Sequence, residues 1–120
     1  MLMAKTLPDW QNEIDAYISQ FKEGYFSPLS MVARLAEEVG EIARAVSHLY
    51  GEKPRKKDER PSSLSEELGD LLFVVITFAN AESIDLDQSL TKVLEKYRTR
   101  DKDRWTKWES EACSSNDDTI

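Results

Sequence analysis

Two short acidic segments of the chain have residue types and spacing that suit metal binding. The segments EEVGEI (residues 37–42) and EELGDL (residues 66–71) are close variants of one pattern. Each places two acids three positions apart, and on an α-helix such residues are neighbours with Cβ atoms about 5–6 Å apart. The two pairs are Glu38 with Glu41 and Glu67 with Asp70. If the two helices pack together, four carboxylates converge.

Four convergent carboxylates repel one another and need cations between them. Two unit charges about 4 Å apart repel by about 1 kcal/mol in water and by about 4 kcal/mol in a partly buried site. Arg34, four residues before Glu38, supplies a positive charge on the first of these helices, whereas residues 71–79 contain no basic residue. Hard divalent cations prefer oxygen ligands. The pattern therefore predicts a site for Mg²⁺, with Mn²⁺ as a substitute.

A solvent-exposed charged helix face is the ordinary explanation for any single pair of this kind. Three features favour a site instead. The pattern occurs twice, Asp70 leads directly into an apolar run, and each segment contains a glycine, Gly40 or Gly69. Glycine inside a helix costs about 1 kcal/mol relative to alanine, so its use suggests the close approach of a ligand or a backbone. Histidine-based metal chemistry is disfavoured, because His48 is the only histidine and is expected at the surface or in a cap.

Helix-start residues precede four stretches of the chain and predict an all-α fold. The expected helices follow Thr6, Ser27, Ser63 and Asp85, and the first three end near Gly24, Tyr50 and Ala81. A short fifth helix is expected from Trp105. No segment alternates with the period of a strand. The apolar stripe of the second helix is expected to face the core; it consists of Val32, Leu35, Ala36, Val39, Ile42, Ala43 and Val46.

The third expected helix is apolar nearly all round over residues 71–79 and must be buried on most sides. Four helices from one chain barely provide that cover. The sequence therefore predicts that a second copy packs there, giving a homodimer or a tetramer.

The length of 120 residues predicts one domain, assigned to residues 1–112, with a disordered tail at 113–120. A formal net charge of −7 argues against binding to nucleic acid polymers or to anionic membranes. The single cysteine, Cys113, and the absence of a signal-peptide pattern indicate the cytoplasm. The charged loop of residues 51–62 is interpreted as a solvated loop or as a flap over phosphates.

The chain resembles the MazG-type nucleotide pyrophosphohydrolases, which belong to the all-α NTP pyrophosphatase superfamily. The resemblance covers about residues 8–108. The matching segments are EVGE (38–41), ELGD (67–70), the apolar run behind the second of these, and EKYRTRDKDRW (95–105). It implies a MazG-like bundle of four to five helices completed by homo-oligomerisation. It also implies Mg²⁺-dependent hydrolysis of a nucleoside triphosphate (NTP or dNTP) to the monophosphate and pyrophosphate, as nucleotide-pool housekeeping.

Roles for individual residues follow from the resemblance and from the chemistry of such a reaction. Carried over by position, the metal ligands are Glu38, Glu41, Glu67 and Asp70, and Lys96 and Arg100 contact phosphates. Glu37 or Glu41 is a candidate catalytic base. Three aromatic residues are candidates for contact with the nucleobase of the substrate, namely Trp10, Tyr25 and Phe26. Core packing is the competing interpretation for each of them. Two alternatives stay open: a related hydrolase of phosphoribosyl-ATP or nucleoside diphosphates, and a non-catalytic helical interaction module.

Overall fold

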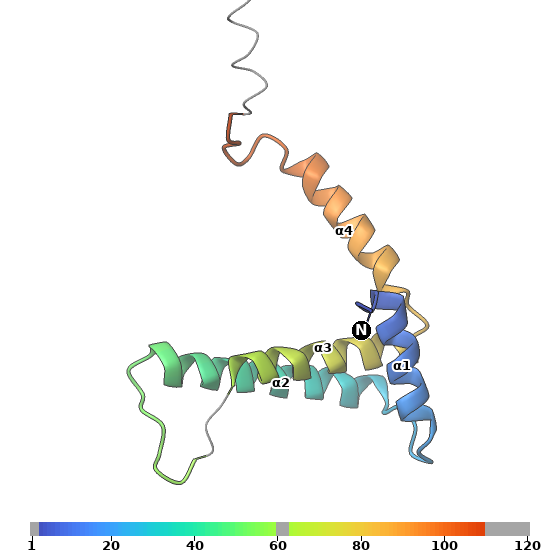
Figure 1. Ribbon diagram of the computed structural model, residues 1–120, viewed down its shortest axis with the longest axis vertical. Helices are drawn as coiled ribbons and strands as arrows, with labels where there is room; N and C mark the ends of the chain where they lie inside the picture. The colour runs from blue at the N-terminus through green and yellow to red at the C-terminus, as the bar shows by residue number, and fades with distance from the viewer. Residues whose placement is uncertain (1–2, 60–62, 110–120) are drawn as a thin grey trace, which may run out of the picture. The chain divides into compact units, whose positions relative to one another are not determined.

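The computed structural model describes residues 3–59 and 63–109, and over these residues the protein is all-helical (Figure 1). The helices are α1 (Leu7–Ser19), α2 (Pro28–Tyr50), α3 (Leu64–Ala81) and α4 (Leu86–Arg100). This confirms the all-α prediction. The chain divides into two compact units between Ser89 and Leu90, and each is described by itself. The expected tail at 113–120 lies outside the described residues.

Helix α1 begins as its sequence predicts and ends earlier. The Thr6 hydroxyl accepts a hydrogen bond from the Asp9 amide, and the Asp9 carboxylate accepts one from the Thr6 amide, which completes a capping box. The helix ends at Ser19, before the expected stop at Gly24. The chain then follows two tight turns, and Gly24 takes a φ of 61°, a left-handed conformation that glycine adopts without strain.

Helices α2 and α3 lie side by side and run antiparallel (Figure 1). Helix α2 has the predicted bounds, because Ser27 caps its start with Pro28 in the first turn and Gly51 caps its end. At the start of α3, the Ser63 hydroxyl accepts a hydrogen bond from the Glu66 amide at 3.3 Å. The two caps fix the lengths of the helices that carry the acidic segments.

Helix α1 packs against α3, and one of its residues, Gln11, also contacts the start of α4. The Gln11 side chain donates to Asn80 Oδ1 at 3.0 Å and to the Ile84 carbonyl at 2.9 Å, and its own Oε1 accepts from the Leu86 amide at 3.0 Å. Asn80 Nδ2 returns a hydrogen bond to the Gln11 carbonyl at 2.9 Å. This polar contact fixes α1 against the C-terminal end of α3.

The core of α2 differs from the expected apolar stripe. Met31 and Ala45 are buried, whereas Val32, Val39 and Val46 are 52%, 55% and 38% exposed. The prediction was wrong for these three valines and for Ala36 and Ala43, which are also exposed, because a single neighbouring helix covers a narrower strip of α2 than the sequence pattern offers. Leu35 and Ile42 are partly buried. In α3 the buried residues gather in the second half; they are Val74, Ile76, Thr77 and Ala79.

The remaining segments are less well packed. His48, expected at the surface or in a cap, has a side chain only 12% exposed, with Nε2 lying 3.5 Å from a Glu59 carboxylate of the charged loop. Helix α4 has no buried residue. After it the chain forms turns over residues 101–105, and up to residue 109 it contains no fifth helix. Within the described ranges, no helix is both long and apolar enough to cross a membrane.

Candidate functional site

The two acidic segments meet across the α2–α3 pair and form a carboxylate cluster of three residues. One oxygen each of Glu38, Glu67 and Asp70 lies within 4.8 Å of the other two. Glu38 comes from the middle of α2, and the other two come from successive turns of α3. Glu38 and Glu67 are half-buried and Asp70 is exposed, so the cluster is accessible from solvent. Three of the four predicted metal ligands are therefore brought together.

The fourth predicted ligand, Glu41, lies beside this cluster and has a cation of its own. Its Oε2 is 3.9 Å from Nη1 of Arg44, one turn further along α2. Glu41 is nevertheless close enough for its charge to affect Glu67. Glu37, the other candidate base, is exposed on α2 and outside the cluster.

The electrostatics of the cluster show uncompensated negative charge. The pKa of Glu67 is raised above its usual 4.5, first by partial burial and then by the negative charges of Asp70, Glu41, Glu38 and Glu66. Within the described residues, Glu38, Glu67 and Asp70 make no ion pair. Oxygen donors in close proximity, without a protein cation, fit a hard divalent ion by their chemistry.

Arg34 does not compensate Glu38 in the way its spacing suggested. Its guanidinium carbon lies 5.9 Å from the centroid of the Phe26 ring, and it makes no ion pair with any described residue. Arg34 therefore places a positive charge on α2 one turn before Glu38 without forming an ion pair with it. The guanidinium turns towards an aromatic face because the turn between α1 and α2 brings Phe26 beside it.

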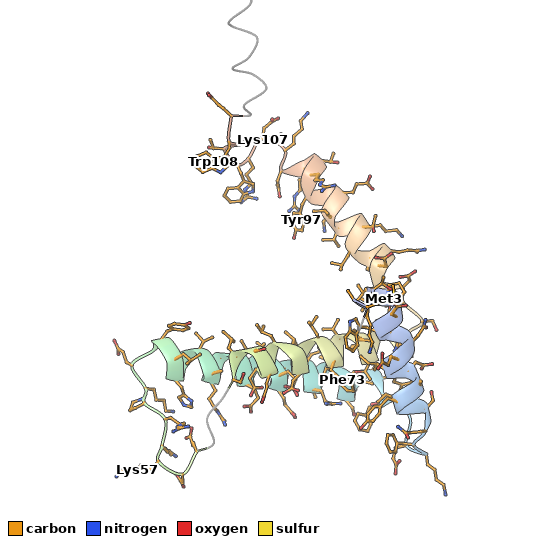
Figure 2. All side chains as sticks on the ribbon, viewed as in Figure 1. Met3, Lys57, Phe73, Tyr97, Lys107 and Trp108 are labelled. Atoms are coloured by element: carbon orange, nitrogen blue, oxygen red, sulfur yellow. The ribbon has the colours of Figure 1, made fainter. Side chains whose placement is uncertain are left out.

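The wall of an aromatic cavity of about 350 Å³ includes Arg34 and Phe73, each of which lies one helical turn from an acid of the carboxylate cluster. The cavity is lined by Tyr17, Ile18, Phe21, Glu23, Gly24, Tyr25, Phe26, Met31, Arg34, Phe73 and Thr77. Two of the three predicted base-contacting residues, Tyr25 and Phe26, are in this wall. Phe73 stands on α3 one turn beyond Asp70, and Figure 2 shows its side chain.

Trp10 lies apart from the other two aromatic candidates. It lines a separate apolar groove of about 300 Å³ together with Gly69 and Leu72, and Lys5 Nζ lies 4.5 Å from its ring centroid. Gly69 faces open space in this groove, since an added Cβ would meet no atom within 4 Å. Because Gly69 has no side chain, nothing projects from the surface beside Asp70 at this position.

Tyr25 is held in the wall of the aromatic cavity by a hydrogen bond. Its hydroxyl donates to Asp15 Oδ1 of α1. Burial, followed by this hydrogen bond to a carboxylate, raises the pKa of Tyr25 to about 12. The phenol is thus a neutral donor, fixed in orientation at any ordinary pH.

Lys96 and Arg100, the predicted phosphate contacts, belong to the unit that begins at Leu90. Both lie over the ring of Tyr97, at 5.4 Å and 4.9 Å from its centroid (Tyr97 is labelled in Figure 2). Arg100 also pairs with Asp101 at 3.3 Å, which raises its pKa further. These residues form a basic and aromatic surface on α4, and their role stays a prediction.

Sequence reasoning missed most of the cavity wall. Tyr17, near the end of α1, and Phe21, in the turn after it, were not among the candidate residues, and Phe73 was assigned only to the apolar run of residues 71–79. A usable signal was present, since Arg34 and Phe73 each lie one helical turn from an acid of the cluster.

Comparison with known proteins gives consistent matches. The family model described as the MazG nucleotide pyrophosphohydrolase domain matches residues 26–105. The uncharacterized protein YpjD of Bacillus subtilis strain 168 is 57% identical over 105 residues, covering 88% of this chain and 95% of YpjD.

Two crystal structures are also similar to this chain. That of the candidate pyrophosphatase YpjD from Bacillus subtilis has a TM-score of 0.71 and 53% identity, and the match covers 80% of this chain and 98% of that one. That of the Bacillus-conserved MazG protein, a nucleotide pyrophosphohydrolase, has a TM-score of 0.71 and 57% identity, covering 85% and 99%.

Proposed function

Because the chain belongs to the MazG nucleotide pyrophosphohydrolase family, we propose that it hydrolyses nucleoside triphosphates (NTP or dNTP) to the monophosphate and pyrophosphate. The observation that carries the proposal is the cluster of Glu38, Glu67 and Asp70. Their carboxylate oxygens lie within 4.8 Å of one another, and none of the three makes an ion pair with a described residue. Such a cluster repels a polyanionic substrate unless a divalent ion accompanies it.

We assign Mg²⁺ to this cluster, with Mn²⁺ as a substitute, and Glu41 as a further ligand or as a base. A divalent ion held there would supply charge neutralisation for the phosphates and would polarise a water for attack. The three clustered carboxylates hold and position the ion through their oxygens. We assign to Glu41, which lies outside the cluster, the role of accepting a proton from water, and Glu37 is the second candidate for this role.

The other substrate contacts are assigned to the aromatic cavity and to α4. Tyr25 and Phe26 offer flat apolar surfaces to a nucleobase, while Trp10 lines the neighbouring groove. Lys96 and Arg100 supply positive charge for the departing pyrophosphate. We place the activity in residues 1–112 and in the cytoplasm, acting on the nucleotide pool rather than on nucleic acid polymers or membranes.

A homodimer or tetramer is part of the same proposal. Three exposed valines of α2, Val32, Val39 and Val46, and the exposed Leu72 of α3 leave apolar surface uncovered on these helices. Apolar surface of this extent is typical of protein interfaces. Sedimentation of the full chain tests this, and a monomer at micromolar concentration would contradict it.

The activity is tested by incubating the full chain with each nucleoside triphosphate and Mg²⁺. We expect pyrophosphate and the monophosphate as products, with no orthophosphate. Asp70→Asn should lose the activity and keep its helical circular dichroism, while Asp87→Asn on α4 is the matched control. Orthophosphate release, or no turnover of any normal or modified triphosphate, would contradict the proposal. Calorimetry with Mn²⁺ separates an enzyme from a metal-free interaction module.

A further inference from the structure

The aromatic cavity begins one helical turn from the carboxylate cluster on both α2 and α3, the two helices that carry the clustered acids. On α2, Arg34 precedes Glu38 by four residues, and on α3, Phe73 follows Asp70 by three. One turn of helix rises about 5.4 Å. A nucleotide with its phosphates at the carboxylates therefore reaches the cavity with its base. The volume of about 350 Å³ lies within the usual range for small-molecule sites.

Arg34 is the unusual residue in this cavity. It is half-buried in a wall that is otherwise mostly aromatic and aliphatic, and its guanidinium carbon lies 5.9 Å from the Phe26 ring centroid. It makes no hydrogen bond or ion pair with the described residues, and the carboxylate of Glu23 in the same lining is not within 4.0 Å of it. Its N–H donors are consequently available to a ligand.

We propose that Arg34 determines base specificity and selects purines that present two adjacent hydrogen-bond acceptors, as guanine does with O6 and N7. The guanidinium is a planar fork of donors with no acceptor, and it pairs bidentately with these two atoms. Adenine offers N7 beside an amino group, so one donor of Arg34 faces another donor. This inference rests on the proposed function, because it assumes that the phosphates bind at the carboxylates.

The aromatic walls have a complementary part in this selection. The Phe26 ring lies within cation–π range of Arg34, at 5.9 Å from its guanidinium carbon, and this contact favours orientations of the guanidinium towards the ring. Tyr25 is fixed by its hydrogen bond to Asp15 and closes the same cavity. A guanidinium fixed in this way discriminates more sharply than a flexible ammonium, which lacks the planar fork.

The test compares dGTP, dATP and 7-deaza-dGTP, in which a C–H group replaces N7. For the wild type we expect kcat/KM for dGTP to exceed that for each of the other two by about 5- to 150-fold, the range for one bidentate pair. Arg34→Ala should abolish both preferences, mainly through KM for dGTP. Arg34→Lys, which keeps the charge and loses the fork, should lose most of the preference for dGTP over 7-deaza-dGTP.

Lys22→Ala is the matched control, since it removes an exposed positive charge near the cavity without touching its lining. It should keep both preferences. Calorimetry with the monophosphates dGMP, dAMP and 7-deaza-dGMP gives a readout independent of turnover, and it should show the same order of affinities and the same dependence on Arg34.

The outcomes separate the two proposals. Turnover with equal kcat/KM for the three triphosphates, or a preference that survives in Arg34→Ala, would overturn the role of Arg34 and leave the activity standing. Absence of turnover, together with Arg34-dependent binding of dGMP, would overturn the activity and support the base site.

Discussion

The two acidic segments are nearly the same in sequence and differ in their surroundings. On α2, Glu41 has Arg44 as a partner at 3.9 Å, and only Glu38 enters the carboxylate cluster. On α3 both Glu67 and Asp70 enter it, and neither pairs with a cation among the described residues.

The position three residues after the second acid also differs between the two segments. It is Arg44 on α2 and Phe73 on α3. The arginine partly neutralises its own segment, whereas the phenylalanine continues into the wall of the aromatic cavity. The repeated acidic pattern therefore predicts that the two helices meet. The residues one turn beyond each acidic segment differ, and they give the carboxylates of the two segments different surroundings.

The largest loss of activity is expected for a substitution in the α3 segment, whose two clustered acids have no ion-pair partner among the described residues. Asp70→Asn removes one oxygen charge from the cluster and should lower kcat/KM by more than about 100-fold, since even indirect partners of metal ligands often contribute 10- to 100-fold. Steady-state release of pyrophosphate measures this. Activity within a few-fold of the wild type would show that the α3 segment does not hold the metal.

A smaller effect is expected for the acid that has a partner. Glu41→Gln should weaken Mn²⁺ binding less than Glu67→Gln does, because Glu41 lies outside the cluster. Isothermal calorimetry of the two variants gives the ratio directly. Equal losses would mean that Glu41 moves into the coordination sphere when metal binds, which would remove the asymmetry between the segments.

A pH effect should follow from Glu67. Its pKa is raised above 4.5, so protons compete with metal at a higher pH than for an ordinary glutamate. Mn²⁺ affinity should fall as the pH drops through this raised pKa, and Glu67→Gln should remove that step from the profile. A profile that is identical in Glu67→Gln would assign the titration to another carboxylate.

The smallest expected effect is on the stability of the metal-free protein. A raised pKa means that, between pH 4.5 and the folded-state value, the folded chain holds more protons than the unfolded chain. Stability therefore decreases as the pH rises through that window. At neutral pH Glu67→Gln should raise the metal-free Tm slightly by relieving repulsion, whereas Glu41→Gln should not, since it also loses Arg44. Thermal melts in excess chelator test this contrast.

Much of the fold could be predicted from local signals. Capping residues located the starts of all four helices, and the end of α2 at Tyr50 was also predicted, because these depend on a few neighbouring residues. The meeting of Glu38 with Glu67 and Asp70 was predictable as well, since one spacing occurs twice.

What could not be predicted depends on residues distant in sequence. The direction of the Arg34 side chain is decided by Phe26 across a turn. The separation of Trp10 from Tyr25 depends on the side of α1 that faces α3. The exposure of Val32 and Val39 depends on which neighbours α2 has, and helical periodicity does not contain that information.

The polar contact at Gln11 has a consequence for how the protein can diversify. It anchors α1, which supplies Tyr17 to the cavity and none of the clustered acids, by the side-chain amides of Gln11 and Asn80, which are not part of the cavity lining. New residues at Tyr17 or Phe21 therefore alter the pocket while the anchor and the acids stay in place. Evolution or a protein engineer can retune ligand choice along this short helix and the turn that follows it, without rebuilding the reactive centre.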